Sequence, residues 1–468
     1  MTRQELETIY EAEQDRHVSV WRELVRFPSV SADPARRDDC VACANWLVGR
    51  LTAIGFEARL IETSGLPVVH AERPGPPGAP VALYYGHYDV QPVDPADLWR
   101  TPPFEPVLKD GRLYGRGAQD NKGQMAYALA ALDVLVRHDA LTCGVRLVLE
   151  GEEESSGPGL KELLERCPEL FQADFLLVTD TGMDPSGRPA ITAGLRGVVQ
   201  LEARLRCANK DLHSGIHGGV APNAAHAAAR LAASLHRADG RVAVKGFYDD
   251  ALEPSPQERT EAGRALFDAD AYRVLTGIGP TPGEKRYTLA ERVGFRPSLD
   301  INGLAAGHAG PGFKTVIPCE AALKISARTV AGQDPDRVLD RLAGHLNEHL
   351  PPEASLEIVG RKSAGAALRV PLDAPALRAA RAALDNLGAG PAVFRWEGAS
   401  VPIVADLARV SGAVPVLVGF GMEEDNIHAP NESFPLARFR QGFLFVARLL
   451  GGGVASGGME EGPVTGDQ

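Results

Sequence analysis

The amino-acid sequence predicts an α/β domain that is interrupted by an inserted α+β domain with an antiparallel sheet. Near both ends of the chain, short apolar runs without alternation indicate strands that are buried on both faces. In the middle of the chain, apolar and polar residues alternate along the strands, which is typical of antiparallel sheets. The expected boundaries are 1–192 and 367–450 for the α/β domain, 193–366 for the inserted domain and 451–468 for a disordered tail.

The first part of the chain supplies two helices and then three buried strands. Apolar residues recur at helical spacing in ELETIYEAEQDRHVSVWRELVRF and DDCVACANWLVGRLTAIG, each ended by a Pro or Gly signal. The predicted strands are VALYYGH, VRLVLEG and DFLLVTD, and the helix NKGQMAYALAALDVLVRHD separates the first two. Ligands bind where the strands of an open α/β sheet end. These three strands end in ionisable residues, namely His87 with Asp89, Glu153 with Glu154, and Asp180.

The inserted domain repeats a strand followed by a helix. The alternating strands GVVQLEARLRC and EAALKISARTV precede the helices APNAAHAAARLAASLHR and DPDRVLDRLAGHLNEHL. After Ala366, the helix APALRAARAALDNLG, the strand VPVLVGFG and the helix FPLARFRQGFLFVARLLGG return to the first architecture. The tail from Gly451 is rich in Gly and small polar residues, so it has too little apolar surface to order itself.

The charge and the apolar pattern exclude two classes of partner. The 468 residues carry a formal net charge of −12, which repels the phosphate backbone of nucleic acids. Residues 1–20 are polar and acidic, unlike a signal peptide, and no apolar run reaches the roughly 18 residues of a membrane span. We therefore expect a cytoplasmic protein with neither a nucleic-acid nor a membrane partner.

The cysteines do not indicate a disulfide scaffold. Six cysteines in a chain of this length are too few and too scattered for such a framework. Cys40 and Cys43 form a C-x-x-C pair, but they lie on a predicted helix and no second Cys or His pair follows nearby. Buried helical thiols are therefore favoured over a metal or redox site.

Several ionisable residues stand where a metal site could form. His87 and Asp89 are two apart on a strand, so the carboxylate could orient a metal-bound imidazole; a polar strand end is the alternative. Asp120 follows small residues at the start of a helix, where it is either a ligand shared by two cations or a helix cap. His428, in DNIHAPNES, adds a second imidazole. Nitrogen and oxygen donors without a thiolate favour zinc, manganese or cobalt.

Seven motifs occur in the order and rough spacing of one enzyme family. They are GHYDVQP, GRGAQDNKG, EGEEESSGPGL, DLHSGIHGG, SLDINGL, KTVIP and NIHAPNE, and the likeness extends over about residues 20–445. In these motifs the chain resembles the M20 family of metallopeptidases, and most of all its cytosolic nonspecific dipeptidase and carnosinase branch. The resemblance implies a three-layer catalytic domain with a mixed sheet, interrupted by a lid and dimerisation domain.

The resemblance also implies two divalent metal ions per subunit, zinc or manganese. Asp120 would bridge both ions, and His87 and Asp180 would bind one of them. Glu154 and His428 would bind the other. The complete implied ligand set is His87, Asp120, Glu154, Asp180 and His428. Glu153 is the implied general base, and Asp89 orients the imidazole that precedes it. Glu152 occupies a variable position of the family pattern.

The inserted domain is implied to contribute to substrate binding and catalysis. His213, in DLHSGIHGG, would enter the active site of a partner subunit and polarise the scissile carbonyl, which requires a homodimer. Arg328, Thr315 and Ser400 would hold the free C-terminal carboxylate of the substrate, since the planar guanidinium can bond both oxygens. WEGASVPIV departs from the family pattern at Trp396 and Ala399, which alters the edge of this pocket.

The implied function is hydrolysis of the peptide bond in dipeptides or short peptides with a free C-terminal carboxylate. In this mechanism Glu153 activates a water that bridges the two metal ions. An N-acyl-amino-acid deacylase or desuccinylase of the same family is the alternative, because it would share every metal ligand. A catalytically silent binding module is a remote alternative, since the implied base and all implied ligands are present.

Overall fold

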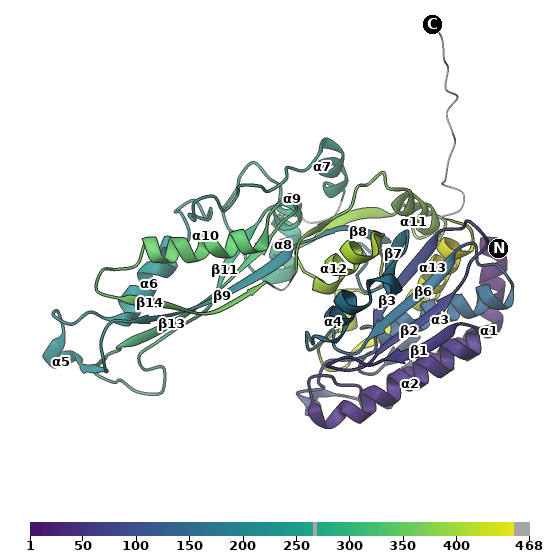
Figure 1. The fold of residues 1–468 in the computed structure, drawn as a ribbon, viewed down its shortest axis with the longest axis horizontal. Coiled ribbons are helices and arrows are strands. Elements are labelled where there is room, and N and C mark those ends of the chain that lie inside the picture. The colour runs from purple at the N-terminus through teal and green to yellow at the C-terminus, as the bar shows by residue number, and fades with distance from the viewer. Residues whose placement is uncertain (265–268, 364, 454–468) are drawn as a thin grey trace, which may run out of the picture. The chain divides into compact units, whose positions relative to one another are not determined.

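The computed structural model describes residues 1–264, 269–363 and 365–453, and the chain divides into two units. Unit 1 comprises Met1–Ala193, Val370–Phe394 and the chain from Asp406 onward. Unit 2 comprises Gly194–Arg369 and Arg395–Ala405, and is therefore inserted into unit 1 along the sequence (Figure 1). One unit has a large mixed sheet and the other an antiparallel sheet, which confirms the predicted fold class.

Unit 1 combines helices with one large and one small sheet. Its helices are α1 Arg3–Val25, α2 Arg37–Ile54, α3 Lys122–Arg137, α4 Gly159–Arg166, α11 Pro375–Asp385 and α13 Leu436–Arg448, and α12 Pro402–Ser411 begins in unit 2. Its large sheet contains β1 Glu57–Ile61, β2 Val68–Arg73, β3 Val81–His87, β6 Gly144–Glu150, β7 Phe175–Val178 and β17 Val414–Leu417, and it also includes β8 Ala190–Leu195 and β16 Val393–Glu397. The small sheet contains β4 Val107–Lys109, β5 Arg112–Tyr114 and β18 Ser433–Pro435.

The central strands of the large sheet run parallel. The strand order is β1-β2-β6-β3-β7-β17-β8-β15, in which β15 is Leu368–Arg369, and β16 also pairs with β8. β3 is parallel to both β6 and β7, and β17 is parallel to β7, whereas β2 and β8 pair with their neighbours in antiparallel fashion. Because β3, β6 and β7 point the same way, the residues that follow them gather at one edge of the sheet.

Local sequence signals and aromatic packing place the helices of unit 1. Thr2 and Glu5 form a reciprocal capping box at the start of α1, and α2 ends at Gly55, whose φ of 102° suits glycine. Trp21 of α1 stacks on Phe439 of α13 with a centroid distance of 4.8 Å, and Tyr127 of α3 meets the same ring edge-on. This aromatic cluster joins the two ends of the chain behind the loop that precedes α3.

Unit 2 is built around a four-stranded antiparallel sheet in the order β11-β13-β9-β14. These strands are β9 Gly197–Arg206, β11 Ser298–Ala306, β13 Glu320–Thr329 and β14 Ser355–Ser363. The shorter strands are β10 Leu212–His213, β12 Val316–Ile317 and β15 Leu368–Arg369, and the helices are α5 Ser214–His217, α6 Ala224–Ser234, α7 Pro256–Ala262, α8 Ala269–Thr276, α9 Leu289–Phe295 and α10 Pro335–Glu348. The apolar face of the sheet is covered by α6 and α10 (Figure 1), whose residues share one buried cluster with it.

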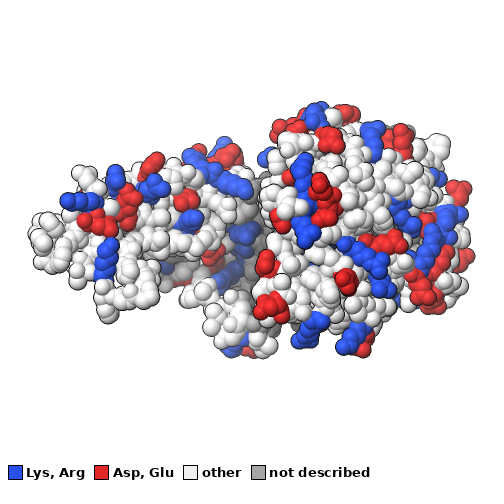
Figure 2. All heavy atoms as spheres, turned by 90° about the horizontal axis from the view of Figure 1, so that it is seen from below, with Lys and Arg blue, Asp and Glu red and all other residues white. Residues whose placement is uncertain are grey.

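The structure also shows how the cysteines and the charged side chains are placed. None of the helices in the described ranges is long and apolar enough to cross a membrane. Cys40 and Cys43 are buried on α2, and all six cysteines are free thiols. Figure 2 shows acidic and basic side chains interspersed on the face in view. Residues 454–468, which make up most of the predicted tail, lie outside the described residues.

Candidate metal centre

The carboxyl ends of the parallel strands and the start of α3 form a cluster of nitrogen and oxygen donors. His87 is the last residue of β3, and Asp180 follows two residues after β7. Asp120 lies in the loop just before α3. Two groups of side chains in the described residues place one donor atom each within 4.8 Å of one another. Their spacing suits divalent cations, because Asp, Glu and His are the donors that zinc and manganese accept.

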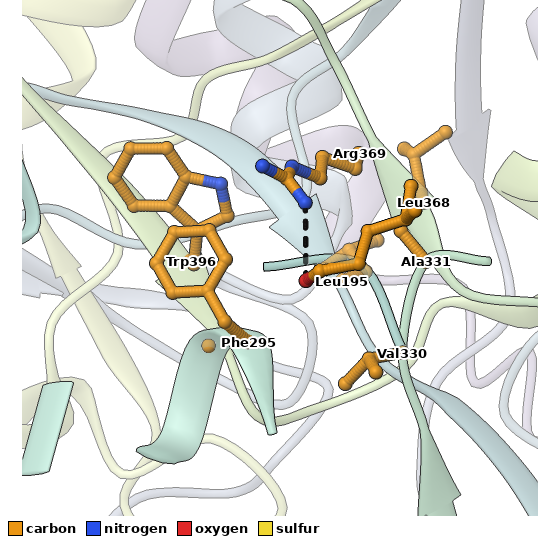
Figure 3. Close-up of a pocket in the computed structure, with 9 residues that line it drawn as sticks. Leu195, Phe295, Val330, Ala331, Leu368, Arg369 and Trp396 are labelled. Atoms are coloured by element: carbon orange, nitrogen blue, oxygen red, sulfur yellow. Dashed lines mark hydrogen bonds between the residues drawn. The ribbon is translucent and has the colours of Figure 1, made fainter. Parts of the chain in front are cut away.

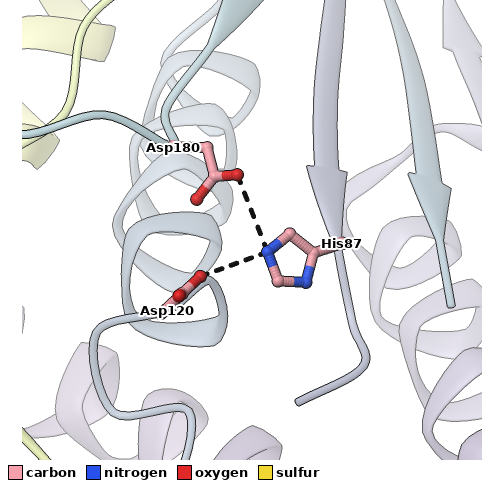
Figure 4. A group of neighbouring side chains, drawn as sticks. All are labelled: His87, Asp120 and Asp180. Carbon is pink, nitrogen blue, oxygen red and sulfur yellow. Dashed lines mark hydrogen bonds and ion pairs between the residues drawn. The ribbon is translucent and has the colours of Figure 1, made fainter. Parts of the chain in front are cut away.

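The first donor group consists of His87, Asp120 and Asp180 (Figure 4). The Nε2 atom of His87 lies 3.2 Å from Asp120 Oδ1 and 3.7 Å from Asp180 Oδ2. All three side chains are largely buried, and they come from three separate segments of the chain. The three donor atoms therefore converge on one point without sharing a secondary-structure element.

The second donor group consists of Asp120, Glu154 and His428. His428 Nε2 lies 3.0 Å from Asp120 Oδ2 and 3.3 Å from Glu154 Oε1. Asp120 thus takes part in both groups, and it offers a different carboxylate oxygen to each. A carboxylate arranged in this way can bridge two cations, as two-metal hydrolases require.

Asp89 fixes the orientation of the His87 imidazole. Its carboxylate Oδ1 lies 3.3 Å from His87 Nδ1, on the opposite side of the ring from the donor cluster. The Ser31 hydroxyl donates to Asp89 Oδ2 at 2.6 Å, and the Glu154 backbone N–H donates to the same atom at 3.1 Å. Nδ1 is hydrogen-bonded to the Asp89 backbone carbonyl at 3.1 Å, with the carboxylate close beside it, so Nε2 is left as the nitrogen that faces the cluster.

Glu432 holds the loop that carries Asp120, a role that the sequence patterns did not predict. Its Oε1 accepts hydrogen bonds from the backbone N–H groups of Gln119 at 2.9 Å and Asp120 at 3.1 Å. Its Oε2 accepts from Arg116 Nη1 at 2.7 Å and from the Gly117 N–H at 2.9 Å. Glu432 is fully buried and is the last residue of the NIHAPNE motif. Its place in that motif is the feature of the sequence that could have indicated a functional role.

Two amides orient further donors, and sequence reasoning missed both of them. Asn121 donates from Nδ2 to Asp180 Oδ1 at 2.7 Å, which leaves Oδ2 facing His87. Gln91 donates from Nε2 to Glu154 Oε2 at 2.7 Å, which leaves Oε1 facing His428. Each carboxylate therefore presents one oxygen to the cluster, because the other oxygen is held by an amide.

The pKa values of the groups in the cluster indicate an excess of negative charge. Burial lowers the pKa of His87, but the facing carboxylates, chiefly Asp180, raise it well above the usual histidine value. Hydrogen bonds that His428 donates to the carboxylates of Asp120 and Glu154 raise the pKa of His428 to about 10. Burial and neighbouring acids raise the pKa of Asp180 well above its usual range. The closely spaced carboxylates therefore favour protonation of the cluster. Divalent cations would supply the positive charge that these protons provide, so the residues fit a two-metal centre.

The three consecutive glutamates differ in their surroundings. Glu154 belongs to the second donor group, whereas Glu153 belongs to neither group. Burial raises the pKa of Glu153 to about 7, close to the value that suits a general base. Glu152 also belongs to neither donor group. Its carboxylate instead accepts a hydrogen bond from the Gly159 N–H at 3.1 Å. A Cβ atom at Gly65 would lie only 2.0 Å from this carboxylate, so Glu152 is packed into the loop structure.

In unit 2, the structure brings His213 and Thr315 together. His213 pairs with Val316 between β10 and β12, and the Thr315 carbonyl accepts a hydrogen bond from the Ser214 N–H at 3.1 Å. The Gly215 N–H donates to His213 Nδ1 at 3.0 Å. A neutral imidazole that accepts at Nδ1 carries its proton on Nε2, so the exposed side of this ring is a hydrogen-bond donor.

Arg328 and Ser400 also meet within unit 2. Arg328 Nη1 donates to Ser400 Oγ at 2.9 Å, and the Ser400 hydroxyl donates to the Arg196 carbonyl. The Ala399 carbonyl accepts from the Arg196 N–H at 3.2 Å. The segment around Ser400 is therefore tied to the start of β9 through its backbone as well as its side chain.

Trp396 is an internal packing residue of unit 2. Its ring lies 4.7 Å from that of Phe295 and helps to line a small pocket that also contains Leu195 and Arg369 (Figure 3). Only 8% of Trp396 is exposed, and a Cβ atom at Gly194 would approach the indole to 2.5 Å. The substitution relative to the family pattern therefore fills the interior of the unit.

A model of the peptidase family M20/M25/M40 matches residues 83–451 of this chain. The chain belongs to this family. The match includes every residue of both donor groups, which lie between His87 and His428. The protein is thus a metallopeptidase of the M20 type with two candidate sites for divalent cations.

Named relatives of this M20 peptidase align along most of its length. The Beta-Ala-His dipeptidase of Homo sapiens is 29% identical over 441 residues, which span 92% of this chain and 85% of the relative. The Cysteinylglycine-S-conjugate dipeptidase of Corynebacterium striatum is 30% identical over 417 residues, which span 88% of this chain and 90% of the relative.

Solved structures of the family share the fold. The M20 family metallo-carboxypeptidase of Sulfolobus solfataricus has a TM-score of 0.80 at 28% identity, covering 93% of this chain and 98% of that chain. Human carnosine dipeptidase 1 has a TM-score of 0.77 at 25% identity, covering 96% of this chain and 98% of that chain. This M20 peptidase therefore shares its fold with these family members.

Removal of divalent metal should destabilise the protein. Without cations, the buried carboxylates repel one another, whereas a ligand present at about 100 times its Kd stabilises the folded state by about 2.7 kcal/mol. We expect the midpoint of thermal unfolding to fall after chelation and to recover when zinc or manganese is added back. An unchanged midpoint under both treatments would contradict a metal centre at these residues.

The variant Glu432→Gln should weaken metal binding although Glu432 is not a proposed ligand. The amide cannot accept from all four donors as the carboxylate does, so the loop at Asp120 loses its anchor and metal affinity should fall about 10-fold to 100-fold. Metal titration of the purified variant, followed by calorimetry, measures this change. Glu105→Gln, which removes an exposed carboxylate from the same unit, is the control and should bind metal normally.

Proposed function

We propose that this chain is a two-metal dipeptidase that releases amino acids from dipeptides or short peptides with a free C-terminal carboxylate. The observation that supports it most directly is the sharing of Asp120 between two donor groups, one oxygen to each. Two relatives that align over most of the chain bear the names of dipeptidases, which favours this substrate class within the family.

The proposed chemistry divides between the cations and the side chains of the protein. Bound divalent cations supply Lewis acidity, which lowers the pKa of water to about 7 and polarises a carbonyl group. Glu153 accepts the proton of the attacking water and later passes it to the leaving amine. Its environment suits both roles, since a carboxyl group with a pKa of about 7 exchanges protons readily near neutral pH.

His213 is proposed to stabilise the negative charge that develops on the carbonyl oxygen. The Gly215 N–H occupies Nδ1, so Nε2–H is the available donor without any change of tautomer. We propose that the enzyme is a homodimer and that His213 acts in the site of the partner subunit. Arg328 and Thr315 are proposed to hold the substrate carboxylate, together with Ser400.

We also propose zinc or manganese as the metal and the cytoplasm as the location. The donor groups contain imidazole nitrogen and carboxylate oxygen and no thiolate, a set that both metals accept. Six cysteines that are all free thiols suit a reducing compartment.

A substrate panel tests the proposed function. The purified enzyme is assayed with zinc and with manganese against dipeptides, N-acetyl amino acids and N-succinyl amino acids. We expect the dipeptides to have the highest kcat/KM. Preference for the acylated amino acids would replace the proposal by a deacylase, and absence of both bound metal and activity would indicate a binding module.

Mixing two inactive variants tests the roles of Glu153 and His213 together. Glu153→Gln and His213→Ala should each lower kcat by about 100-fold or more while retaining metal. If His213 acts in the partner's site, a mixed dimer regains one complete site, and random mixing should restore about a quarter of wild-type activity. Coexpression followed by assay measures this recovery. Mixtures that stay as inactive as the separate variants would show that the two residues act within one subunit.

A further inference from the structure

Two guanidinium groups come together in unit 2 beside Ser298 and Ser400. Arg196 immediately precedes β9, and Arg328 lies on β13, where its backbone is opposite Ser298 of β11. Arg196 Nη1 donates to the hydroxyl of this same Ser298 at 3.2 Å. Arg328 Nη1 donates to Ser400 Oγ, and the Ser400 hydroxyl donates to the carbonyl of Arg196. The two arginines are therefore linked through two serines.

Among the residues that the structure describes, Arg196 is held only by neutral acceptors. Its Nε donates to the Gly398 carbonyl at 3.0 Å, and its Nη1 also lies 3.4 Å from the Arg296 carbonyl. Within the described ranges, no acceptor contacts its Nη2, and neither Arg196 nor Arg328 has a carboxylate within ion-pair distance. Partly buried arginines normally have an anionic partner, so this pair has unused capacity to bind an anion.

The surroundings of Arg196 leave its positive charge without a balancing negative charge close by. Burial, and then the neighbouring charge of Arg328, lower the pKa of Arg196 to about 10. Asp300 opposes this effect only in part, and it lies exposed on β11. With two cations and one exposed acid nearby, a single bound carboxylate would bring the local charge close to balance.

The Ser400 hydroxyl already donates one hydrogen bond and accepts another within unit 2. Its proton points to the Arg196 carbonyl, so its oxygen is free only to accept, and it accepts from Arg328. Ser400 is thus placed to orient the Arg328 guanidinium, whereas Arg196 Nη2 is a donor without a partner among the described residues.

We propose that Arg196 is a second substrate-binding arginine, which donates from Nη2 to the C-terminal carboxylate that Arg328 also binds. Ser400 then takes part in holding the carboxylate through Arg328, whose guanidinium it orients. This inference rests on the proposed function for its substrate, but it requires only a free carboxylate. It therefore applies equally to a dipeptide and to an N-acyl amino acid, and can be tested on whichever the enzyme prefers.

The test compares a preferred substrate with the same compound carrying a C-terminal amide. Arg196→Gln should raise KM for the free acid about 10-fold to 100-fold, with a much smaller change in kcat. The amide lacks the negative charge, so its kcat/KM should change little. Arg204→Gln removes an exposed cation from β9, the strand that follows Arg196, and is the control, which should leave the ratio of acid to amide unchanged.

Folding of the variants is checked by thermal unfolding and by metal content. If Arg196→Gln does not fold, Ser298→Ala serves instead, because it removes one acceptor of the Arg196 guanidinium and keeps the cation. This variant should raise KM for the acid a few-fold and spare the amide. Arg196→Lys should recover part of the selectivity for the acid, since it restores the charge without the fork.

Two results would overturn the inference about Arg196 while leaving the proposed function in place. One is a folded Arg196→Gln enzyme in which KM for acid and amide change equally. The other is a variant series in which Arg328→Gln alone shifts the preference for the free acid. A wild-type enzyme that hydrolyses no dipeptide but cleaves N-acyl amino acids would instead reject the proposed substrate class, and the arginine would be tested on those substrates.

Discussion

The donor cluster depends on one carboxylate, Asp120, being held so that its two oxygens face different imidazoles. His87 approaches one oxygen and His428 the other, at 3.2 Å and 3.0 Å. A carboxylate on a free loop would rotate and satisfy only one neighbour. Here the backbone N–H of Asp120 is bonded to Glu432, so the loop is fixed before any cation binds. Both donor groups therefore share this one carboxylate.

The buried pair of Arg116 and Glu432 is the physical basis of that rigidity. Both side chains are about 1% exposed, and the carboxylate accepts four hydrogen bonds from one loop. A buried ion pair adds little stability by itself, because desolvation offsets most of the attraction. Its value here is geometric, since removing either partner leaves a buried charge and frees the loop that positions Asp120.

The sequence predicted what depends on local pattern. Buried strands that lead to His87 and Asp180 follow from unbroken apolar runs, and parallel strands bring their ends to one edge. Neither the insertion of β17 between β7 and β8 nor the contact between Glu432 and the loop before α3 could be read from periodicity. Arg196 was not singled out for a similar reason, because its neighbour Arg328 is placed by strand register. The effect of Trp396 on the pocket was left open, and the structure shows that glycines make room for its ring inside the unit.

The hydrogen bond between Arg116 and Glu432 spans 316 residues of sequence, and this separation orders events during biosynthesis. A nascent chain that has emerged as far as α3 already has His87 and Asp120 but lacks the anchor of the loop between them. Only after residue 432 has left the ribosome can the loop be fixed and His428 complete the second donor group. The polypeptide therefore assembles both donor groups only after unit 2 and the segments that follow it have been synthesised.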